Sequence, residues 1–172
     1  GKEMPFVGIV SKENDSNFIK NAISKNARAG NFEVININRK SIENVKNVKF
    51  DVLVICENIE KLLKNSSYLE EIIKKADYII VNSDVRENLS SLKNVETNII
   101  TYGFNAKATI TISSIKEEKT MVCIQRKING VNNVIEEQDF NVEIEKNNVN
   151  KLYNVLVIFT ILAIYGEILQ KI

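Results

Sequence analysis

The chemistry open to this chain rests on carboxylates, lysines or a bound cofactor, because its 172 residues include no histidine. Histidine is the most frequent general base near neutral pH and the commonest metal ligand, so Ser-His-Asp triads, Cys-His pairs and histidine-based zinc sites are excluded. Glu13 and Asp15 stand close together and could form a metal-binding or acid–base pair. The sequence offers no third ligand beside them, and a solvated loop is the favoured interpretation. We expect neither a catalytic residue nor a metal site.

The two cysteines, Cys56 and Cys123, are interpreted as structural residues. Both fall in expected strands, and they lack the close spacing of a zinc knuckle or a CxxC pair. Small buried hydrophobic residues in a reducing compartment are favoured over a disulfide. The first residues contain no long apolar segment with a cleavage site, so secretion is not indicated and we expect a cytoplasmic location.

The composition is typical of one globular domain, which we expect to span residues 1–172. Hydrophobic residues make up 44% of the chain and charged residues 26%, enough apolar side chains to fill a core. The formal net charge is only +1, and the lysines are scattered among glutamates. Such a balance gives no general attraction for phosphate backbones or anionic lipid. Neither a nucleic-acid nor a membrane partner is expected.

The first 104 residues alternate between short β-branched runs and stretches with helical spacing. This alternation predicts an α/β fold with a parallel sheet flanked by helices. Strands are expected over residues 6–10, 32–37, 50–56, 78–81 and 98–102. Helices are expected over about residues 16–28, between the third and fourth strands with a break near 65–67, and over 86–92.

The pattern changes after Gly103. Residues 105–149 contain three alternating segments, ATITISSI, TMVCIQRKI and FNVEIEK, with no helical pattern between them. They predict a small antiparallel β extension. Residues 150–172 predict a C-terminal apolar helix over about 152–169, which is short for a membrane span and is interrupted by Asn154. We favour a helix buried in the core, with an oligomer interface on its outer side as the alternative.

Three segments share their order and spacing with a known family. They are ADYIIVNSD at 76–84, NIITYGFN at 98–105 and NKLYNVLVIFTILAIYG at 150–166. Together they resemble the second half of the central domain of Mur ligases, where a VN-x-DD strand end, an I-T-[YF]-G strand and a helix opening with N-V-x-N follow one another. A weaker likeness extends back to Phe6. The resemblance implies a P-loop-NTPase-like, or Rossmann-like, parallel sheet with a small antiparallel sheet attached.

The phosphate loop of that family is not retained. Mur ligases carry G-T-N-G-K-[ST]-[ST] between the first strand and the first helix, whereas this chain has SKENDSN at 11–17. A phosphate loop needs glycines that turn backbone amides inward, and a lysine that neutralises phosphate charge. Glu13, Asn14 and Asp15 occupy this region, and their carboxylates suit a helix N-terminus but repel a polyphosphate. ATP hydrolysis by the Mur route is therefore not expected.

The resemblance implies four candidate cofactor-binding residues, Ser16, Asn82, Asp84 and Asn154. Ser16 keeps the hydroxyl expected to meet magnesium, although a helix N-cap is its simplest role. Asn82 and Asp84 remain from the VN-x-DD motif and could contact a nucleotide, but a turn that caps the next helix is favoured. Asn154 matches an asparagine that lies near adenine in the family, and a backbone carbonyl would serve it equally well.

Other family features are also altered. Cys56 stands where the family has a metal-supporting glutamate, with Glu57 one residue later, and Lys151 replaces the first asparagine of the helix opening. The 172 residues hold no counterpart of the family's UDP-substrate domain or of the C-terminal domain that helps to close its active site. These differences predict a scaffold that resembles a ligase without its chemistry.

Three functions remain open. The favoured hypothesis is a degenerate Mur-ligase-like domain without ligase activity, which acts as a binding or interaction module and needs no cofactor. The first alternative is a nucleotide-binding subunit or fragment of a Mur-type ligase, which would bind ATP or ADP with Mg²⁺. The second is a structural protein that self-associates through the C-terminal helix or a sheet edge. The expected partner is an unidentified protein or a second copy of the chain.

Overall fold

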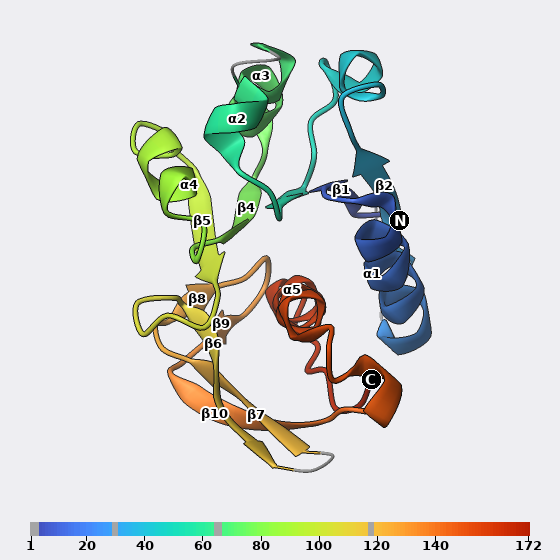
Figure 1. The fold of residues 1–172 in the computed structure, drawn as a ribbon, viewed down its shortest axis with the longest axis vertical. Helices are drawn as coiled ribbons and strands as arrows, with labels where there is room; N and C mark the ends of the chain where they lie inside the picture. The colour runs from blue at the N-terminus through green and yellow to red at the C-terminus, as the bar shows by residue number, and fades with distance from the viewer. Residues whose placement is uncertain (1–3, 29–30, 64–66, 117–118) are drawn as a thin grey trace.

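One large, mostly parallel sheet forms the centre of the fold (Figure 1). The structure is a computed structural model, and it describes residues 4–28, 31–63, 67–116 and 119–172. The sheet strands within these ranges are β1 (Phe6–Val10), β2 (Glu33–Ile37), β3 (Val52–Ile55), β4 (Tyr78–Asn82), β5 (Asn98–Tyr102), β6 (Ile110–Lys116), β7 (Lys119–Ile124) and β10 (Gln138–Glu143). Their order across the sheet is β10-β7-β6-β5-β4-β3-β1-β2.

Helices cover both faces of this sheet, which confirms the expected α/β class (Figure 1). The α-helices are α1 (Glu13–Asn26), α2 (Ile59–Leu63), α3 (Ser67–Lys75), α4 (Arg86–Ser91) and α5 (Leu152–Ile164), and the 3₁₀ turns are η1 (Ile42–Val45) and η2 (Lys146–Asn148). Helices α1 and α5 pack on one face of the sheet, and η1, α2, α3 and α4 pack on the other. Each face therefore has its own hydrophobic cluster.

The parallel part of the sheet, in the order β2-β1-β3-β4-β5, agrees with the five expected strands to within two residues at each end. Strand β1 lies between β2 and β3, and its Val7 pairs with Val34 of β2 on one side and Val52 of β3 on the other. Every residue of β3 and β4 is buried, which explains their continuous apolar sequences. Of the residues 65–67, near which a helix break is expected, 65 and 66 lie outside the described ranges and Ser67 begins α3.

The antiparallel strands extend the central sheet. Strand β7 pairs antiparallel with both β6 and β10, as expected. Strand β6 also pairs in parallel with β5 through Tyr102 and Ile110, so the extension is continuous with the parallel part. A separate two-stranded sheet, β8 (Ile128–Asn129) with β9 (Val134–Ile135), was not expected, because two-residue strands are too short to give an alternating pattern.

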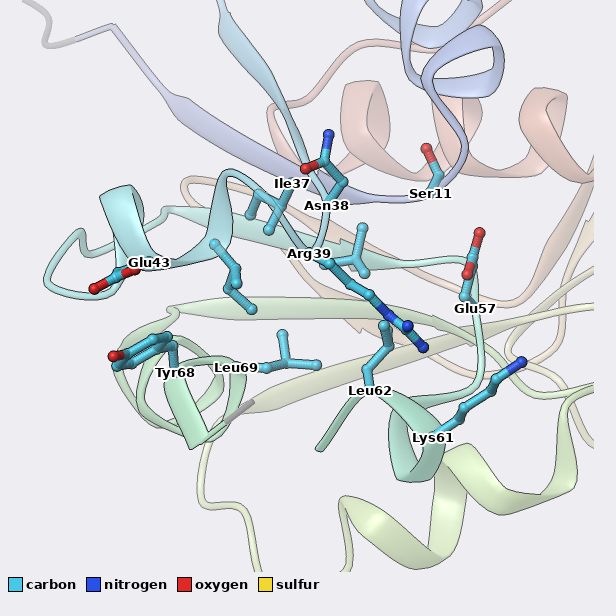
Figure 2. Close-up of a pocket in the computed structure, with 12 residues that line it drawn as sticks. Ser11, Ile37, Asn38, Arg39, Glu43, Glu57, Lys61, Leu62, Tyr68 and Leu69 are labelled. Carbon is cyan, nitrogen blue, oxygen red and sulfur yellow. The ribbon is translucent and has the colours of Figure 1, made fainter. Parts of the chain in front are cut away.

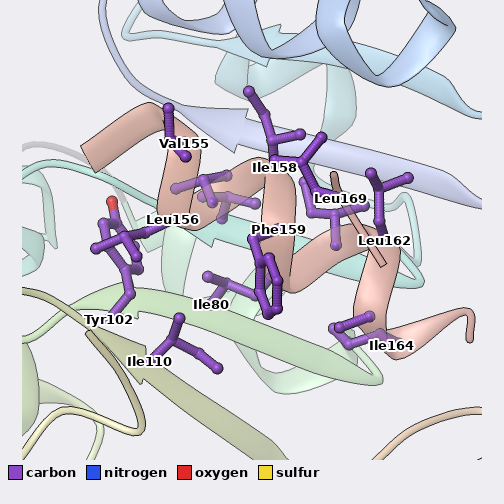
Figure 3. Close-up of a cluster of buried hydrophobic side chains, with 14 of the residues drawn as sticks. Ile80, Tyr102, Ile110, Val155, Leu156, Ile158, Phe159, Leu162, Ile164 and Leu169 are labelled. Atoms are coloured by element: carbon purple, nitrogen blue, oxygen red, sulfur yellow. The ribbon is translucent and has the colours of Figure 1, made fainter. Parts of the chain in front are cut away.

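Helix α5 lies at the centre of the larger hydrophobic cluster. Figure 3 shows Leu156 and Phe159 beside the strand side chains Ile80 and Ile110. All residues from 154 to 164 are buried within the chain itself, which confirms the expected buried helix. The alternative of an oligomer interface on its outer side is not supported, because this helix has no apolar face turned outward.

The helix ends earlier than its apolar sequence suggests. Gly166 adopts a left-handed conformation with φ of +81°, and the N–H of Glu167 bonds to the carbonyl of Leu162 at 2.9 Å. This is the usual way in which a glycine terminates a helix. Helix α5 therefore stops at Ile164 instead of residue 169. Among the helices of the described ranges, none is both long and apolar enough to cross a membrane.

Candidate functional site

The connection between β1 and α1, where the resemblance places a phosphate loop, consists of only Ser11 and Lys12. Helix α1 begins at Glu13, one turn before its expected start, because the carboxylates of Glu13 and Asp15 complement the positive end of the helix. A phosphate loop of the Walker type needs a glycine-rich run of several residues between strand and helix. The observed connection is too short to wrap around a phosphate.

The expected N-cap role of Ser16 is wrong. Lys12 occupies the N-cap position and makes no side-chain capping bond. Ser16 lies inside the first turn, where its buried hydroxyl donates a 3.0 Å hydrogen bond to the carbonyl of Glu13. The early helix start explains the difference, since it moves the true cap four residues upstream. The hydroxyl that would meet magnesium in the family therefore bonds to its own helix.

Asn82 ends β4, and Asp84 lies in the turn that follows it, as the sequence predicts. The side-chain oxygen of Asn82 accepts the backbone N–H of Asp84 at 2.9 Å, and the Asn82 carbonyl accepts the side chain of Asn88. The expected capping of the next helix is wrong, because Val85 is the N-cap of α4 and no side chain caps it. The side-chain oxygen of Asn82 accepts a hydrogen bond inside the turn, so it does not cap the helix.

The carboxylate of Asp84 is the most highly bonded polar group at this edge of the sheet. It accepts the backbone N–H groups of Phe104 at 2.8 Å and Asn105 at 3.2 Å, the side-chain amide of Asn105 at 2.6 Å and the hydroxyl of Tyr153 at 2.7 Å. Gly103 leaves space for this network, since a Cβ there would lie 2.6 Å from an Asp84 oxygen. The donors occupy the carboxylate completely, so it has little capacity for a ligand.

The network also fixes the protonation states of its members. Burial by itself raises the pKa of Asp84, but the hydrogen bonds from Asn105, Phe104 and Tyr153 outweigh burial and leave this pKa below its ordinary value. Burial and the neighbouring Asp84 carboxylate raise the pKa of Tyr153 to about 12. Asp84 is therefore ionised and Tyr153 protonated near neutral pH, which is the pairing that their hydrogen bond requires.

The lowered pKa of Asp84 predicts a pH-dependent contribution to stability. An aspartate whose pKa is lower in the folded than in the unfolded state stabilises the fold above its unfolded pKa of about 4, and this contribution disappears as the pH falls through the folded pKa. We expect the difference in unfolding free energy between wild type and Asp84→Asn to be largest near neutral pH and to shrink in acid. Urea unfolding at a series of pH values measures it.

Tyr153→Phe is the matched variant for this experiment. It keeps the Asp84 carboxylate and removes one of its hydrogen bonds, so a smaller loss of stability is expected with the pH dependence largely retained. The assigned network would be contradicted if the difference in unfolding free energy between wild type and Asp84→Asn stayed constant down to strongly acidic pH.

Asn154 connects α5 to α1. Its side-chain amide donates to the carboxylate of Asp15 at 2.9 Å, and Asn154 is only 7% exposed. The partner is thus an aspartate and not the backbone carbonyl considered from the sequence. Asp15, which the sequence analysis placed in a solvated loop, instead lies in the first turn of α1 and bonds to a buried residue. This interaction holds the start of α5 against the start of α1.

Cys56 directly follows β3, at the position where the resemblance implies a metal-supporting glutamate. Its backbone N–H donates to the carbonyl of Val10 at 3.0 Å, and burial raises the pKa of its thiol to about 12. A thiol that stays protonated is a poor metal ligand. Cys56 and Cys123 are both free, in agreement with the expectation of no disulfide, although each is partly exposed instead of fully buried. Within the described ranges, no three acidic or cysteine side chains come together as a possible metal site.

The four residues suggested by the resemblance thus lie in the first turn of α1, at or just after the end of β4, and in the first turn of α5. Each is bonded to a group of the protein itself. Two participants were missed from the sequence, Tyr153 and Asn105. Tyr153 precedes Asn154 by one residue and Asn105 ends the NIITYGFN segment, so the only available signal was their position inside the segments already singled out.

A pocket of about 400 Å³ lies at the carboxyl ends of β1, β2 and β3, on the face covered by η1, α2 and α3 (Figure 2). This volume is within the range of ~300–1,000 Å³ typical of small-molecule sites. Its apolar lining includes Ile37, Ile42, Leu62 and Leu69, and its charged lining consists of Arg39, Glu43, Glu57 and Lys61. None of the four residues suggested by the resemblance is among the described residues that line it.

The order of helices and strands defines an α/β protein with a mostly parallel central sheet. No family model and no curated protein matches the chain. The Mur-ligase relationship therefore stays a prediction that rests on the three sequence segments.

Proposed function

We propose that this chain is a Mur-ligase-like domain with a P-loop-NTPase-like ancestry that has lost ATP-dependent ligase activity and acts as a binding or interaction module. The observation that carries the proposal is the two-residue connection between β1 and α1. It has neither the length nor the glycines of a phosphate loop, and α1 begins with Glu13 and Asp15. A polyphosphate at this helix N-terminus would meet two carboxylates and no lysine held in a phosphate loop.

The hydrogen-bond network supports the same proposal. A nucleotide that contacted Asp84 or Asn154 would have to displace Tyr153, Asn105 or Asp15 from them. Breaking a charge-assisted hydrogen bond without replacement costs about 1.5–3 kcal/mol. These residues therefore act as internal connections between α1, α5 and the strand ends. The proposal includes a reducing, cytoplasmic location, supported by the two free cysteines.

Nucleotide titration tests the proposal. With ATP or ADP and Mg²⁺ at millimolar concentration, we expect no rise in melting temperature and no release of phosphate. A nucleotide present at 100 times its dissociation constant would stabilise the fold by about 2.7 kcal/mol, which thermal unfolding detects easily. An active P-loop ATPase run in parallel controls the phosphate assay. Tight binding accompanied by hydrolysis would overturn the proposal, and stabilisation without hydrolysis would favour the alternative of a nucleotide-binding ligase subunit.

A further inference from the structure

The pocket beside β1, β2 and β3 combines an apolar floor with two cationic side chains, Arg39 and Lys61. Lys61 already has an interaction partner, so Arg39 is the cation considered for a ligand. Ile37 and Leu69 are buried members of the hydrophobic cluster on this face, and Leu62 packs against that cluster. Figure 2 shows the Arg39 side chain extending along the pocket toward Leu62. A ligand seated here would cover apolar surface with its body and reach a guanidinium with its polar end. Burying apolar surface would supply the attraction, and the guanidinium would set the orientation.

Arg39 is available for such a contact. Within the described residues, its guanidinium donates no hydrogen bond and belongs to neither ion pair, Lys49 with Asp77 or Lys74 with Glu70. A guanidinium presents several N–H donors in a plane that matches the two oxygens of a carboxylate. An exposed arginine at the edge of an apolar pocket therefore favours a ligand with an anionic group.

Two glutamates limit how much negative charge the ligand can carry. Glu43 and Glu57 also line the pocket, and Figure 2 shows them on opposite sides of Arg39. The carboxylates of Glu43 and Glu57 repel a ligand that carries a polyphosphate or two negative charges more strongly than they repel a ligand that carries a single carboxylate. The charge arrangement thus favours a ligand with one negative charge.

We infer that this pocket binds a small singly charged carboxylate with an apolar body, oriented by Arg39. The inference rests on the proposed function, because it gives the binding module a class of ligand. It concerns a different part of the sheet edge from Asp84 and Asn154, so nucleotide binding and carboxylate binding can be measured separately. Occupation of the pocket would not require any change in the hydrogen-bond network of Asp84.

Probes with one shared body and different charge test the inference. Calorimetric titration of the full chain with 2-naphthoate, 2-naphthylmethanol and 2-naphthylmethylammonium compares an anion, a neutral molecule and a cation of similar size. We expect naphthoate to bind roughly tenfold more tightly than the alcohol, the gain typical of one charge-assisted pair. The ammonium compound should bind most weakly. Naphthyl phosphate should bind more weakly than naphthoate because of Glu43 and Glu57.

The matched variants are Arg39→Gln and Arg86→Gln. Both arginines are exposed, and Arg86 lies on α4 away from the pocket lining, so neither replacement should disturb folding. We expect Arg39→Gln to abolish the preference for naphthoate over the alcohol and Arg86→Gln to retain it. Absence of naphthoate binding at millimolar concentration, equal binding of the three probes, or an unchanged preference in Arg39→Gln would overturn the inference.

The same titrations separate the two proposals. Naphthoate binding without any response to ATP supports both of them. If naphthoate does not bind, the proposed ligand class is wrong, and the proposed loss of ATP-dependent ligase activity is unaffected. Hydrolysis of ATP overturns the proposed function, whichever result naphthoate gives.

Discussion

Replacement of Phe159 by alanine is expected to lower the free energy of unfolding by about 3–5 kcal/mol. The Phe159 side chain is completely buried in α5, and its ring lies 5.4 Å from that of Phe140 between centroids. Its neighbours belong to a helix and strands that are held by their own backbone hydrogen bonds. They cannot move far enough to fill the vacated space, so most of the cavity and of the lost contacts will persist.

Urea unfolding followed by circular dichroism measures this loss, with Phe104→Ala as the matched control. Phe104 is 47% exposed and its ring lies 4.6 Å from that of Tyr153 between centroids, so the same chemical deletion should cost about 1 kcal/mol or less there. Equal losses in the two variants would mean that α5 is not packed in the core as described. The denaturant slope should stay the same in both variants if they unfold to a similar chain.

The second large effect is expected at Gly8, in strand β1, which lies between β2 and β3. A Cβ at this position would lie 2.7 Å from Cδ1 of Ile37 and 2.9 Å from the ring of Phe50. Both neighbours are buried, and β1 is paired on both sides, so neither the side chains nor the strand can move away freely. Gly8→Ala should cost about 1–3 kcal/mol through overpacking, although alanine would otherwise suit an extended strand.

A double-mutant cycle with Ile37→Val tests the cause. Valine lacks Cδ1, the atom nearest to the new methyl group, so it should recover part of the stability lost in Gly8→Ala. By itself Ile37→Val should destabilise the protein by about 0.5–1.5 kcal/mol. Strictly additive effects, or a Gly8→Ala variant as stable as wild type, would show that this contact does not limit the packing of β1.

The parallel strands could be predicted from the sequence because strands that are buried on both faces have nearly continuous apolar sequences. Strands β3 and β4 are apolar at nearly every position, and no other short element requires that. The start of α1 was misplaced because several residues between 13 and 16 can begin a helix, and sequence pattern alone does not rank them. The continuity between β5 and β6 depends on one parallel pair, Tyr102 with Ile110, which no local pattern encodes.

The candidate sites were less predictable than the fold. Asp84 and Asn154 were singled out by residue type and resemblance, but Tyr153 is 69 residues from Asp84 in the chain and Asp15 is 139 residues from Asn154. Such partners meet only when the chain has folded. Arg39 gave no signal at all, since an exposed arginine after a strand is common and only the adjoining apolar pocket makes it notable.

The position of α5 affects how the protein can fold during its synthesis. This helix fills the centre of the larger hydrophobic cluster, yet it is translated more than a hundred residues after β1 and α1, with which it packs. At typical rates of ~5–20 residues per second, the nascent chain spends on the order of ten seconds without α5 on that face of the sheet. Chaperones that recognise apolar segments have this interval in which to bind, and the larger core can close only after α5 has left the ribosome.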